Sequence, residues 1–443
     1  MTTRFESSHH PARHANHCAP LSLLTRRGVL KASMATTLGS LLGPTLPSAF
    51  AGTSQSDVGR PKRKAVILLW LEGGPCQQDS FDPKTATEDE YGYIFGPIST
   101  TSPQVQLSSC LPELARHGHD LCVVRSMISP EFEHSQAQYF FQTGWRITGT
   151  LQAPALGSIV AHELGTEVDI GLPPFVSIGT PGFPSGYFGP AYRPTVVWDP
   201  NEPPENLGLP REVSSETFNR RLRLLQNVEE GRRVGELGQR FHSGRDAALK
   251  FMRSEHLSAF DLSREPEAVR TSYGSTKFER GCLLARRLVE SGVRFVQVRH
   301  GEHGGYDTHE KHYPAHENLL REFDGAAAQL IADLKVRGLL ESTVVIAAGE
   351  FGRTPKVNKN KGRDHWLKGW SLAFAGGGFR GGYVYGKTTD NGDDVAHDPL
   401  TVPDLMATIC HTIGIDPETE YHDELDRPIK LVDDGNIIHD LLA

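Results

Sequence analysis

The sequence predicts an α/β protein with a doubly wound, mostly parallel sheet flanked by helices. Short, continuously apolar runs recur along the chain, as is typical of strands buried on both faces. Stretches with apolar residues at helical spacing lie between many of these runs. The composition, with 38% hydrophobic and 23% charged residues among 443, is that of a globular protein and excludes a collagen-like or disordered chain.

The first expected strand is AVILLWL at residues 65–71, which stops at Glu72-Gly73-Gly74-Pro75. A run this short, followed at once by turn residues, is typical of a buried strand, because helices are longer. By the same pattern, five further strands are expected at residues 121–124, 175–178, 294–298, 344–348 and 372–375.

Helices are expected at residues 214–252, 265–290, 316–335 and 402–413. In the third of these, Leu320, Phe323 and Ala327 share one face at helical spacing. The Gly- and Pro-rich stretch at about 178–210 predicts an irregular insertion over one edge of the sheet.

The N-terminus resembles an export signal. The motif TRRGVLK at residues 25–31 precedes a weakly apolar stretch that ends in Ala-Phe-Ala at 49–51, which predicts a signal peptide of the twin-arginine kind. A chance arginine pair at a helix start is the alternative. We therefore expect a leader at 1–51, a linker at 52–63 and one domain at 64–443, in a protein that the twin-arginine machinery exports to the periplasm or beyond.

Two classes of partner are disfavoured. The net charge is −8 and no long basic tract is present, so nucleic-acid binding is not expected. Apart from the leader, no run approaches the roughly 18 apolar residues of a membrane span.

The six cysteines include no C-x-x-C pair, which argues against a zinc ribbon or thioredoxin chemistry, and buried free thiols are the default expectation.

Acidic and imidazole side chains gather where the expected strands end, with glycines beside them. Because the carboxyl ends of parallel strands meet at one edge of the sheet, we expect these side chains to lie together. Imidazoles with carboxylates suit zinc, manganese or iron, and carboxylates alone suit calcium. The sequence therefore predicts a site for one or two divalent metal ions, with the candidate ligands Glu72, Asp79 (as an outer candidate), Asp307, His309, Glu350 and His365.

Each candidate also has a structural alternative. A lone histidine near a carboxylate is more often hydrogen-bonded or solvated than a ligand. Glu350 could be a helix cap or a partner of Arg353. Arg353 could bind a phosphate or sulfate group as a fork, or form a structural salt bridge. His312 is expected to be solvent-exposed and not a ligand.

Three motifs and the twin-arginine start resemble domain-of-unknown-function family 1501, a group of exported bacterial proteins. The motifs are LWLEGGPCQQDSFDPK, HGGYDTHE and GEFGRTPKVNKNKGRDHW, and the resemblance runs from about Lys64 to the C-terminus. That family is similar to the alkaline-phosphatase-like superfamily of sulfatases, phosphodiesterases and phosphomutases. The resemblance implies an alkaline-phosphatase-like core with metals at the strand ends.

The resemblance also implies individual roles. It places Glu72 at the first-strand ligand position, Asp307 with His309 at one metal, Glu350 in place of an aspartate, and His365 as the last histidine ligand. The spacing from Asp307 to His309 is two residues, whereas the superfamily's is usually four. Phe351 stands where the superfamily places a ligand histidine.

Residues 134–146 resemble the sulfatase nucleophile helix, whose end reads T-G-R. The nucleophile position falls on His134, and the C-x-P-S-R signature is absent from the sequence, so an oxidised-cysteine mechanism is not expected. His134 could be a ligand, a base or a nucleophile, with a ligand or a base preferred, and Ser135 could be a substitute nucleophile. Attack by water at the metal would need neither.

The sequence thus predicts an exported, metal-dependent hydrolase of phosphate or sulfate esters, acting on a small-molecule or glycan ester. Arg353 would bind the ester oxyanion, and His134 or Ser135 would act at the nucleophile position. The alternative is a non-catalytic or glycan-binding exported protein that retains the fold, which Phe351 and the missing hydroxyl nucleophile favour. A sugar-phosphate mutase is a weaker third reading, since an exported enzyme would rarely meet sugar phosphates.

Overall fold

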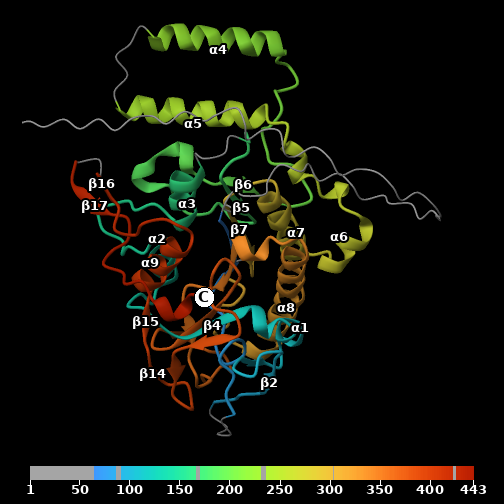
Figure 1. The fold of residues 1–443 in the computed structure, drawn as a ribbon, viewed down its shortest axis with the longest axis vertical. Helices are drawn as coiled ribbons and strands as arrows, with labels where there is room; N and C mark the ends of the chain where they lie inside the picture. Colours follow the sequence, from blue (N-terminus) through green and yellow to red (C-terminus); the bar gives the residue numbers. More distant parts are fainter. Residues whose placement is uncertain (1–63, 86–90, 166–169, 231–235, 303, 423–425) are drawn as a thin grey trace, which may run out of the picture. The chain divides into compact units, whose positions relative to one another are not determined.

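The computed structural model describes residues 64–85, 91–165, 170–230, 236–302, 304–422 and 426–443, and the fold is drawn in Figure 1. The expected leader at 1–51 and linker at 52–63 lie outside the described residues.

A nine-stranded sheet forms the centre of the described chain, in the order β12-β4-β11-β8-β1-β7-β5-β6, with β15 also pairing with β4. β11 runs antiparallel to β4 and β8, and the other pairs are parallel. The predicted mostly parallel α/β sheet is therefore confirmed. Its strands are β1 (Ala65–Leu71), β4 (Leu121–Ile128), β5 (Phe175–Ile178), β6 (Thr195–Val197), β7 (Phe295–His300), β8 (Thr343–Ala348), β11 (Trp370–Ala375), β12 (Tyr383–Tyr385) and β15 (Leu400–Thr401).

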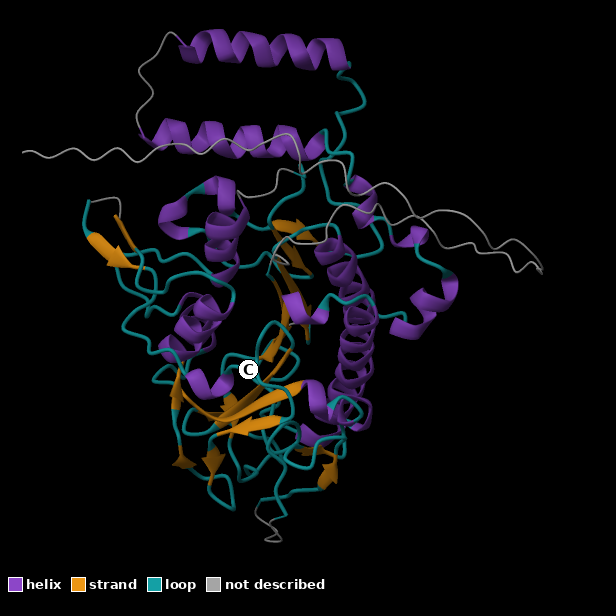
Figure 2. Ribbon diagram, in the orientation of Figure 1, coloured by secondary structure: helices purple, strands orange, loops and turns teal. Residues whose placement is uncertain are grey.

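Both faces of the sheet are covered, as the doubly wound prediction requires. Alternate β1 residues point to opposite faces: Ile67 and Leu69 enter one hydrophobic cluster, and Val66 and Leu68 enter the other. The first cluster includes apolar residues of α1, α7 and α8, and the second includes those of α2, α3 and α9. Figure 2 shows these helices on the two sides of the strands. The bounds are α1 (Pro112–Ala115), α2 (His134–Thr143), α3 (Leu156–Leu164), α7 (Lys277–Glu290), α8 (His312–Val336) and α9 (Val402–Thr412).

Two of the expected helices each correspond to two helices among the described residues. The stretch 214–252 contains α4 (Ser215–Glu230) and α5 (Glu236–Met252), and 265–290 contains α6 (Glu267–Tyr273) and α7. Gly274, with a φ of 114°, ends α6, and Thr276 begins α7 through a capping box with Glu279. Local capping chemistry therefore divides a pattern that reads as one helix.

Short strands are the elements that the apolar runs did not predict. β6, β12 and β15 have three residues or fewer, too few to give a periodic signal. The 178–210 stretch contains two 3₁₀ turns, Gly186–Phe188 and Pro190–Tyr192, before β6 joins the sheet edge. The described residues also form four small two-stranded sheets: β2 (Pro97–Ser99) with β3 (Gln106–Ser108), β9 (Gly352–Arg353) with β10 (His365–Trp366), β13 (Lys387–Thr388) with β14 (Val395–His397), and β16 (Glu420–His422) with β17 (Pro428–Lys430).

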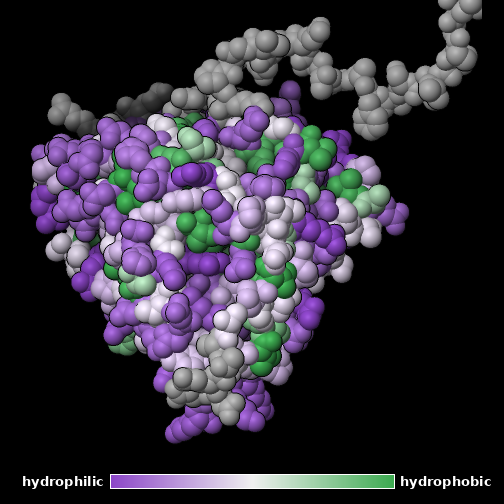
Figure 3. Space-filling model, turned by 60° about the horizontal axis from the view of Figure 1, so that its bottom comes forward, coloured by the Kyte–Doolittle hydropathy of each residue, from purple (hydrophilic) through white to green (hydrophobic). Residues whose placement is uncertain are grey.

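The helices, surface and cysteines of the described residues bear on the expectations about membranes and thiols. Among the described residues, no helix has the length and apolar character needed to cross a membrane. The face drawn in Figure 3 is mostly hydrophilic, with hydrophobic residues in small separate groups. The described cysteines are buried and carry free thiols: Cys76, Cys110, Cys122, Cys282 and Cys410.

Candidate metal centre

Four segments bring polar side chains together at the carboxyl edge of the sheet. Glu350 lies two residues after the end of β8, and Asp307 lies in the loop between β7 and α8. His134 opens α2, whose N-cap Glu133 accepts a hydrogen bond from the Gln136 amide. His365 lies in β10, which pairs with β9. This is the edge at which open α/β sheets bind ligands.

Three of these side chains form a compact ligand set. Ligand atoms of His134, Asp307 and His365 all lie within 4.8 Å of one another. The Nε2 atom of His134 is 3.3 Å from Oδ2 of Asp307, and the Nε2 atom of His365 is 3.3 Å from Oδ1. Each side chain is partly exposed, at 27% for His134, 29% for Asp307 and 21% for His365. The set is therefore reachable from solvent.

The donor set fits a divalent ion. Two imidazoles with one carboxylate suit zinc, manganese or iron. The Nε2 atom of His134 is buried and directed towards Asp307, but it makes no hydrogen bond of acceptable geometry. A cation among these three groups would give that atom a partner.

Glu350 contacts Nδ1 of His134, the ring nitrogen that does not face Asp307. Its Oε1 atom lies 2.7 Å from Nδ1 of His134 and accepts a hydrogen bond of 3.1 Å from Nε2 of Gln138. The backbone amide of Gly73 donates to both oxygens of Glu350, at 3.0 and 3.2 Å. Gly73 has a φ of 104°, and a Cβ there would lie 2.6 Å from the Asp307 amide nitrogen, so this contact requires glycine.

The electrostatics of the cluster favour a proton on His134. Burial opposes its protonation, but the neighbouring carboxylates of Asp307 and Glu350 outweigh burial and raise the pKa of His134 to about 9. Burial likewise opposes the ionisation of Asp307, yet the neighbouring imidazoles of His134 and His365 and the charge of Arg353 hold the pKa of Asp307 well below its usual range. The cluster thus attracts positive charge, whether as protons or as a metal ion.

Arg353 is buried and faces Asp307. One guanidinium nitrogen, Nη2, lies 2.6 Å from Oδ1 of Asp307 and also donates to the Gly73 carbonyl. The others donate to the carbonyls of Gly74 at 3.0 Å and of Arg363 at 3.2 Å. In this arrangement Arg353 orients Asp307, whereas the expected contact with an ester oxyanion would need it to reach solvent.

His309 stands at the exposed side of the cluster. Its Nε2 atom is 3.0 Å from Oδ1 of Asp307 and 3.2 Å from Nε2 of His365, and its side chain is 44% exposed. Its Nδ1 atom is held at 2.7 Å from Oδ1 of Asp364. The structure therefore brings four expected ligands together: Asp307, His309, Glu350 and His365, with His134 among them.

The remaining expected residues lie apart from this group. Glu72 pairs with Arg299, a residue of β7. Ser135 is exposed, and its hydroxyl donates to Oε2 of Glu133 at 2.6 Å. Phe351 is buried against both imidazoles, with ring centroids 4.8 Å from His134 and 4.3 Å from His365. Phe351 is therefore a packing side chain beside the two imidazoles.

Asp79 belongs to a buried network that sequence reasoning missed. The expectation that His312 is exposed is wrong: its side chain is fully buried. Its Nε2 atom lies 2.7 Å from Oδ2 of Asp79, and its Nδ1 atom is 2.5 Å from the Thr308 hydroxyl. His316, one turn later in α8, accepts a hydrogen bond of 3.1 Å from the Cys76 amide. The i, i+4 spacing of these histidines, on the face that carries Leu320, is the signal that could have found them.

This network has ligand atoms at metal-like spacing but already contains a cation. Ligand atoms of Cys76, Asp79 and His312 lie within 4.8 Å of one another. The buried guanidinium of Arg363 lies 4.0 Å from Asp79. Burial opposes the ionisation of Asp79, but the hydrogen bond from His312 and the Arg363 charge hold its pKa well below the usual range. Arg363 supplies the positive charge that an ion would bring, so we interpret this network as structural.

Distant likenesses to solved structures extend over most of the chain. The lipoteichoic acid synthase LtaP of Listeria monocytogenes is 10% identical, with 84% of this chain and 76% of that one covered and a TM-score of 0.37. A protein of the alkaline phosphatase superfamily from Vibrio parahaemolyticus is 10% identical, with 80% and 67% covered and a TM-score of 0.37. The zinc complex of the C-terminal periplasmic domain of EptC from Escherichia coli is 10% identical, with 87% and 97% covered and a TM-score of 0.35.

Likenesses this distant say nothing about the reaction. No curated protein matches the chain. A family model described as protein of unknown function (DUF1501) matches residues 63–442, which include every element of the sheet and the whole candidate centre. The chain therefore belongs to the DUF1501 family.

Proposed function

We propose that this protein is an exported hydrolase that binds a divalent metal ion and cleaves phosphate or sulfate esters. The observation that carries the proposal is the partly exposed set of His134, Asp307 and His365 at the carboxyl edge of the sheet, with ligand atoms within 4.8 Å of one another. Such a set, reachable from solvent and bordered by buried supporting groups, is what ester hydrolysis at a metal requires.

In this proposal His134, Asp307 and His365 hold the ion, and His309 is the outer ligand beside them. A bound divalent ion supplies Lewis acidity, which polarises an ester oxygen and lowers the pKa of a nearby water. Glu350 fixes the ring of His134 through Nδ1, at 2.7 Å, and Arg353 fixes the carboxylate of Asp307, at 2.6 Å. Supporting contacts of this kind orient ligands and raise their affinity.

Proton movements at the chain's own atoms follow from this geometry. Without an ion, the carboxylates beside both nitrogens favour the doubly protonated ring of His134, since they raise its pKa to about 9. Release of the Nε2 proton frees that atom as a ligand, so metal affinity should rise with pH. His309 is the most exposed imidazole of the group and is the best placed to exchange a proton with an ester that enters from solvent.

Metal content tests the proposal directly. The chain lacking residues 1–51 is compared with its His365→Ala variant by mass spectrometry, and His397→Ala, an exposed histidine in β14, is the matched control. We expect at least one equivalent of zinc, manganese, iron or calcium in the parent and control, and at least tenfold less in His365→Ala. Phosphate and sulfate esters are then screened with the loaded protein. A parent that stays metal-free after incubation with each ion contradicts the proposal.

Export is tested separately through the arginine pair. Replacing Arg26 and Arg27 by lysine removes the twin-arginine motif while keeping the charge. We expect the altered protein to remain in the cytoplasm and the parent to appear in the periplasm or medium, as judged by fractionation. Equal export of both would contradict the twin-arginine route.

A second candidate function is binding without catalysis. Phe351, at the position where the resemblance implies a further ligand, packs against His134, and the Ser135 hydroxyl donates to Glu133 instead of the cluster. Both observations favour a site with one ion and no side-chain nucleophile. A protein that binds metal but turns over no ester would support this candidate.

A further inference from the structure

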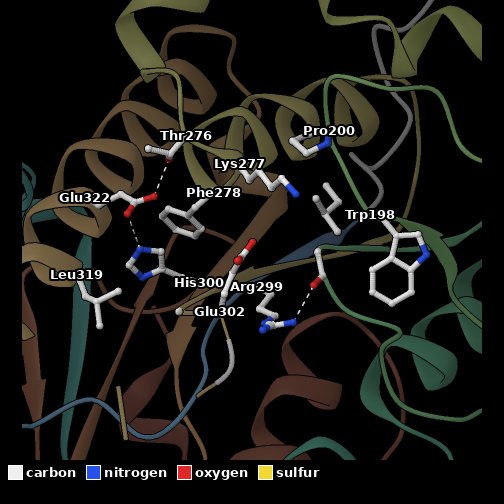
Figure 4. A pocket seen from close by; sticks show the side chains of 13 residues that line it. Trp198, Pro200, Thr276, Lys277, Phe278, Arg299, His300, Glu302, Leu319 and Glu322 are labelled. Carbon is white, nitrogen blue, oxygen red and sulfur yellow. Dashed lines mark hydrogen bonds and ion pairs between the residues drawn. The ribbon is translucent and has the colours of Figure 1, made fainter. Parts of the chain in front are cut away.

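A cavity lies at the same edge of the sheet as the metal centre. It has a volume of about 510 Å³, within the range of roughly 300–1,000 Å³ that small-molecule sites occupy. Its walls come from the ends of β5 and β7, the start of α7, the segment after β6 and the middle of α8. Figure 4 shows its labelled side chains, among them Trp198, Phe278, Arg299 and Glu302.

The cavity exposes an aromatic ring to solvent. Trp198 is 49% exposed, although a side chain this large is usually mostly covered. Pro200 and Phe278 add further apolar surface to the lining. In the view of Figure 4, Trp198 and Phe278 lie on opposite sides of Arg299. An exposed indole in a cavity offers a flat apolar face with a polar edge to a ligand.

The charged groups of the lining balance one another. Lys277 and Arg299 are the cations, and Glu302 and Glu322 are the carboxylates. Glu322 already accepts a hydrogen bond of 2.6 Å from Thr276, and its other oxygen is 3.5 Å from Nε2 of His300.

Both cations also have partners. Arg299 donates to the Gly179 carbonyl at 3.0 Å and pairs with Glu72. Lys277 lies 3.9 Å from Asp199. A lining of this kind does not select an anion. It offers donors and acceptors to hydroxyl groups, which can both give and receive hydrogen bonds.

Two covalent connections limit the distance between the cavity and the metal centre. Glu72, which pairs with Arg299, is bonded to Gly73, whose amide donates to Glu350 of the centre. Adjacent Cα atoms are about 3.8 Å apart. Glu302 lines the cavity and Asp307 belongs to the centre, and five residues of chain span at most about 18 Å. One ligand could therefore reach both.

We propose that this cavity binds an uncharged sugar ring, which forms the alcohol part of the ester that the metal centre cleaves. The second half of this statement rests on the proposed function. A sugar ring has an apolar C–H face and a rim of hydroxyl groups. Trp198 receives the face, and Lys277, Arg299 and Glu302 receive the hydroxyls.

The first experiment measures sugar binding without turnover. The Asp307→Asn variant, which cannot use the centre, is titrated with uncharged gluco-, galacto- and manno-oligosaccharides by calorimetry. We expect millimolar or tighter binding of at least one, and at least tenfold weaker binding after Trp198→Ala is added. Phe241→Ala, at an exposed aromatic on α5 outside the cavity lining, is the matched control and should leave the affinity unchanged.

Other ligand classes decide against the inference. Inorganic phosphate, sulfate and tetramethylammonium are titrated into the same proteins, since an exposed indole can also bind a quaternary amine. If one of these binds with dependence on Trp198 and no saccharide does, the sugar assignment is wrong. Saccharide affinity that is equal in Trp198→Ala also overturns it. Glu302→Gln, at an exposed position, should weaken saccharide binding severalfold without affecting folding.

The second experiment compares substrates in the loaded protein. Trp198→Ala should raise the KM of a sugar ester at least tenfold more than that of a small aryl ester. If no ester is turned over but saccharides bind through Trp198, the proposed function fails and the sugar site stands. If esters are turned over but saccharides do not bind, only the present inference is lost.

Discussion

Two groups of histidines and carboxylates lie near the same edge of the sheet and differ in burial. The network of Asp79, His312 and His316 is at most 1% exposed. The metal centre around Asp307 is roughly one quarter exposed. Asp79 of the network lies in the loop after β1, and Asp307 of the centre and His312 of the network are close in the chain, between the end of β7 and the first turn of α8. Residue type therefore does not distinguish them.

Charge compensation does distinguish them. In the buried network, Arg363 stands beside the single carboxylate of Asp79, and its remaining donors go to backbone carbonyls and Tyr313. In the metal centre, the carboxylates of Asp307 and Glu350 flank His134, and Arg353 contacts only the first of them. We infer that the buried network stabilises the fold and that the open one attracts a cation.

The largest expected effect is on the buried network. Asp79→Ala leaves Arg363 buried without its carboxylate, and removing one partner of a buried pair typically costs about 3–5 kcal/mol. Urea unfolding should show this loss, and Asp246→Ala at an exposed ion pair should change the free energy of unfolding by less than about 0.5 kcal/mol. The metal content of the folded variant should equal that of the parent. A metal-free Asp79→Ala would instead make Asp79 a ligand.

In the metal centre, substitution should instead reduce metal affinity. Asp307→Asn removes the carboxylate that touches both ligand imidazoles, so metal affinity should fall at least tenfold, or about 1.4 kcal/mol. Glu72→Gln, outside the group, should change affinity less than twofold. Competition with a chelator measures both. Equal losses in the two variants would show that the centre extends to Glu72.

The buried network should also make the stability of the protein depend on pH. Burial lowers the pKa of His316 well below its usual value near 6.5, so this imidazole is neutral in the folded protein. Below about pH 6.5 the unfolded chain binds a proton that the folded chain does not, and stability falls as the pH decreases. The slope from one such group is at most about 1.4 kcal/mol per pH unit. Unfolding free energies of the parent and His316→Gln between pH 5 and 8 should show a smaller slope in the variant.

The smallest effect is expected at Ser135. Its hydroxyl is exposed and donates to Glu133, not to the cluster. Ser135→Ala should therefore leave metal affinity and any ester turnover within twofold of the parent. A hundredfold loss of turnover with unchanged metal content would identify Ser135 as the nucleophile.

Much of the fold followed from local patterns. The runs at β1, β5, β7, β8 and β11 were apolar enough to predict buried strands, because a parallel sheet covered on both faces leaves no alternation. β6, β12 and β15 were not predicted, since two or three residues pair only where a neighbouring strand is already in place. Helix ends set by a cap, as at Thr276, were likewise missed.

For the candidate site, the sequence predicted residue types and strand ends but not partners. Asp307, His309, Glu350 and His365 do lie together, because the carboxyl ends of parallel strands meet at one edge. Glu72 follows a strand in the same way, yet its side chain pairs with Arg299.

What the sequence by itself determined is the α/β sheet and the edge at which polar groups collect, since both depend on patterns within short segments. Only the tertiary structure decided which histidines are buried and which are open. His309 and His312 are three residues apart, but α8 carries His312 into the core beside Asp79 and Arg363. Burial and the nearest opposite charge are properties of contacts between distant segments, and these two properties separate the structural network from the metal centre.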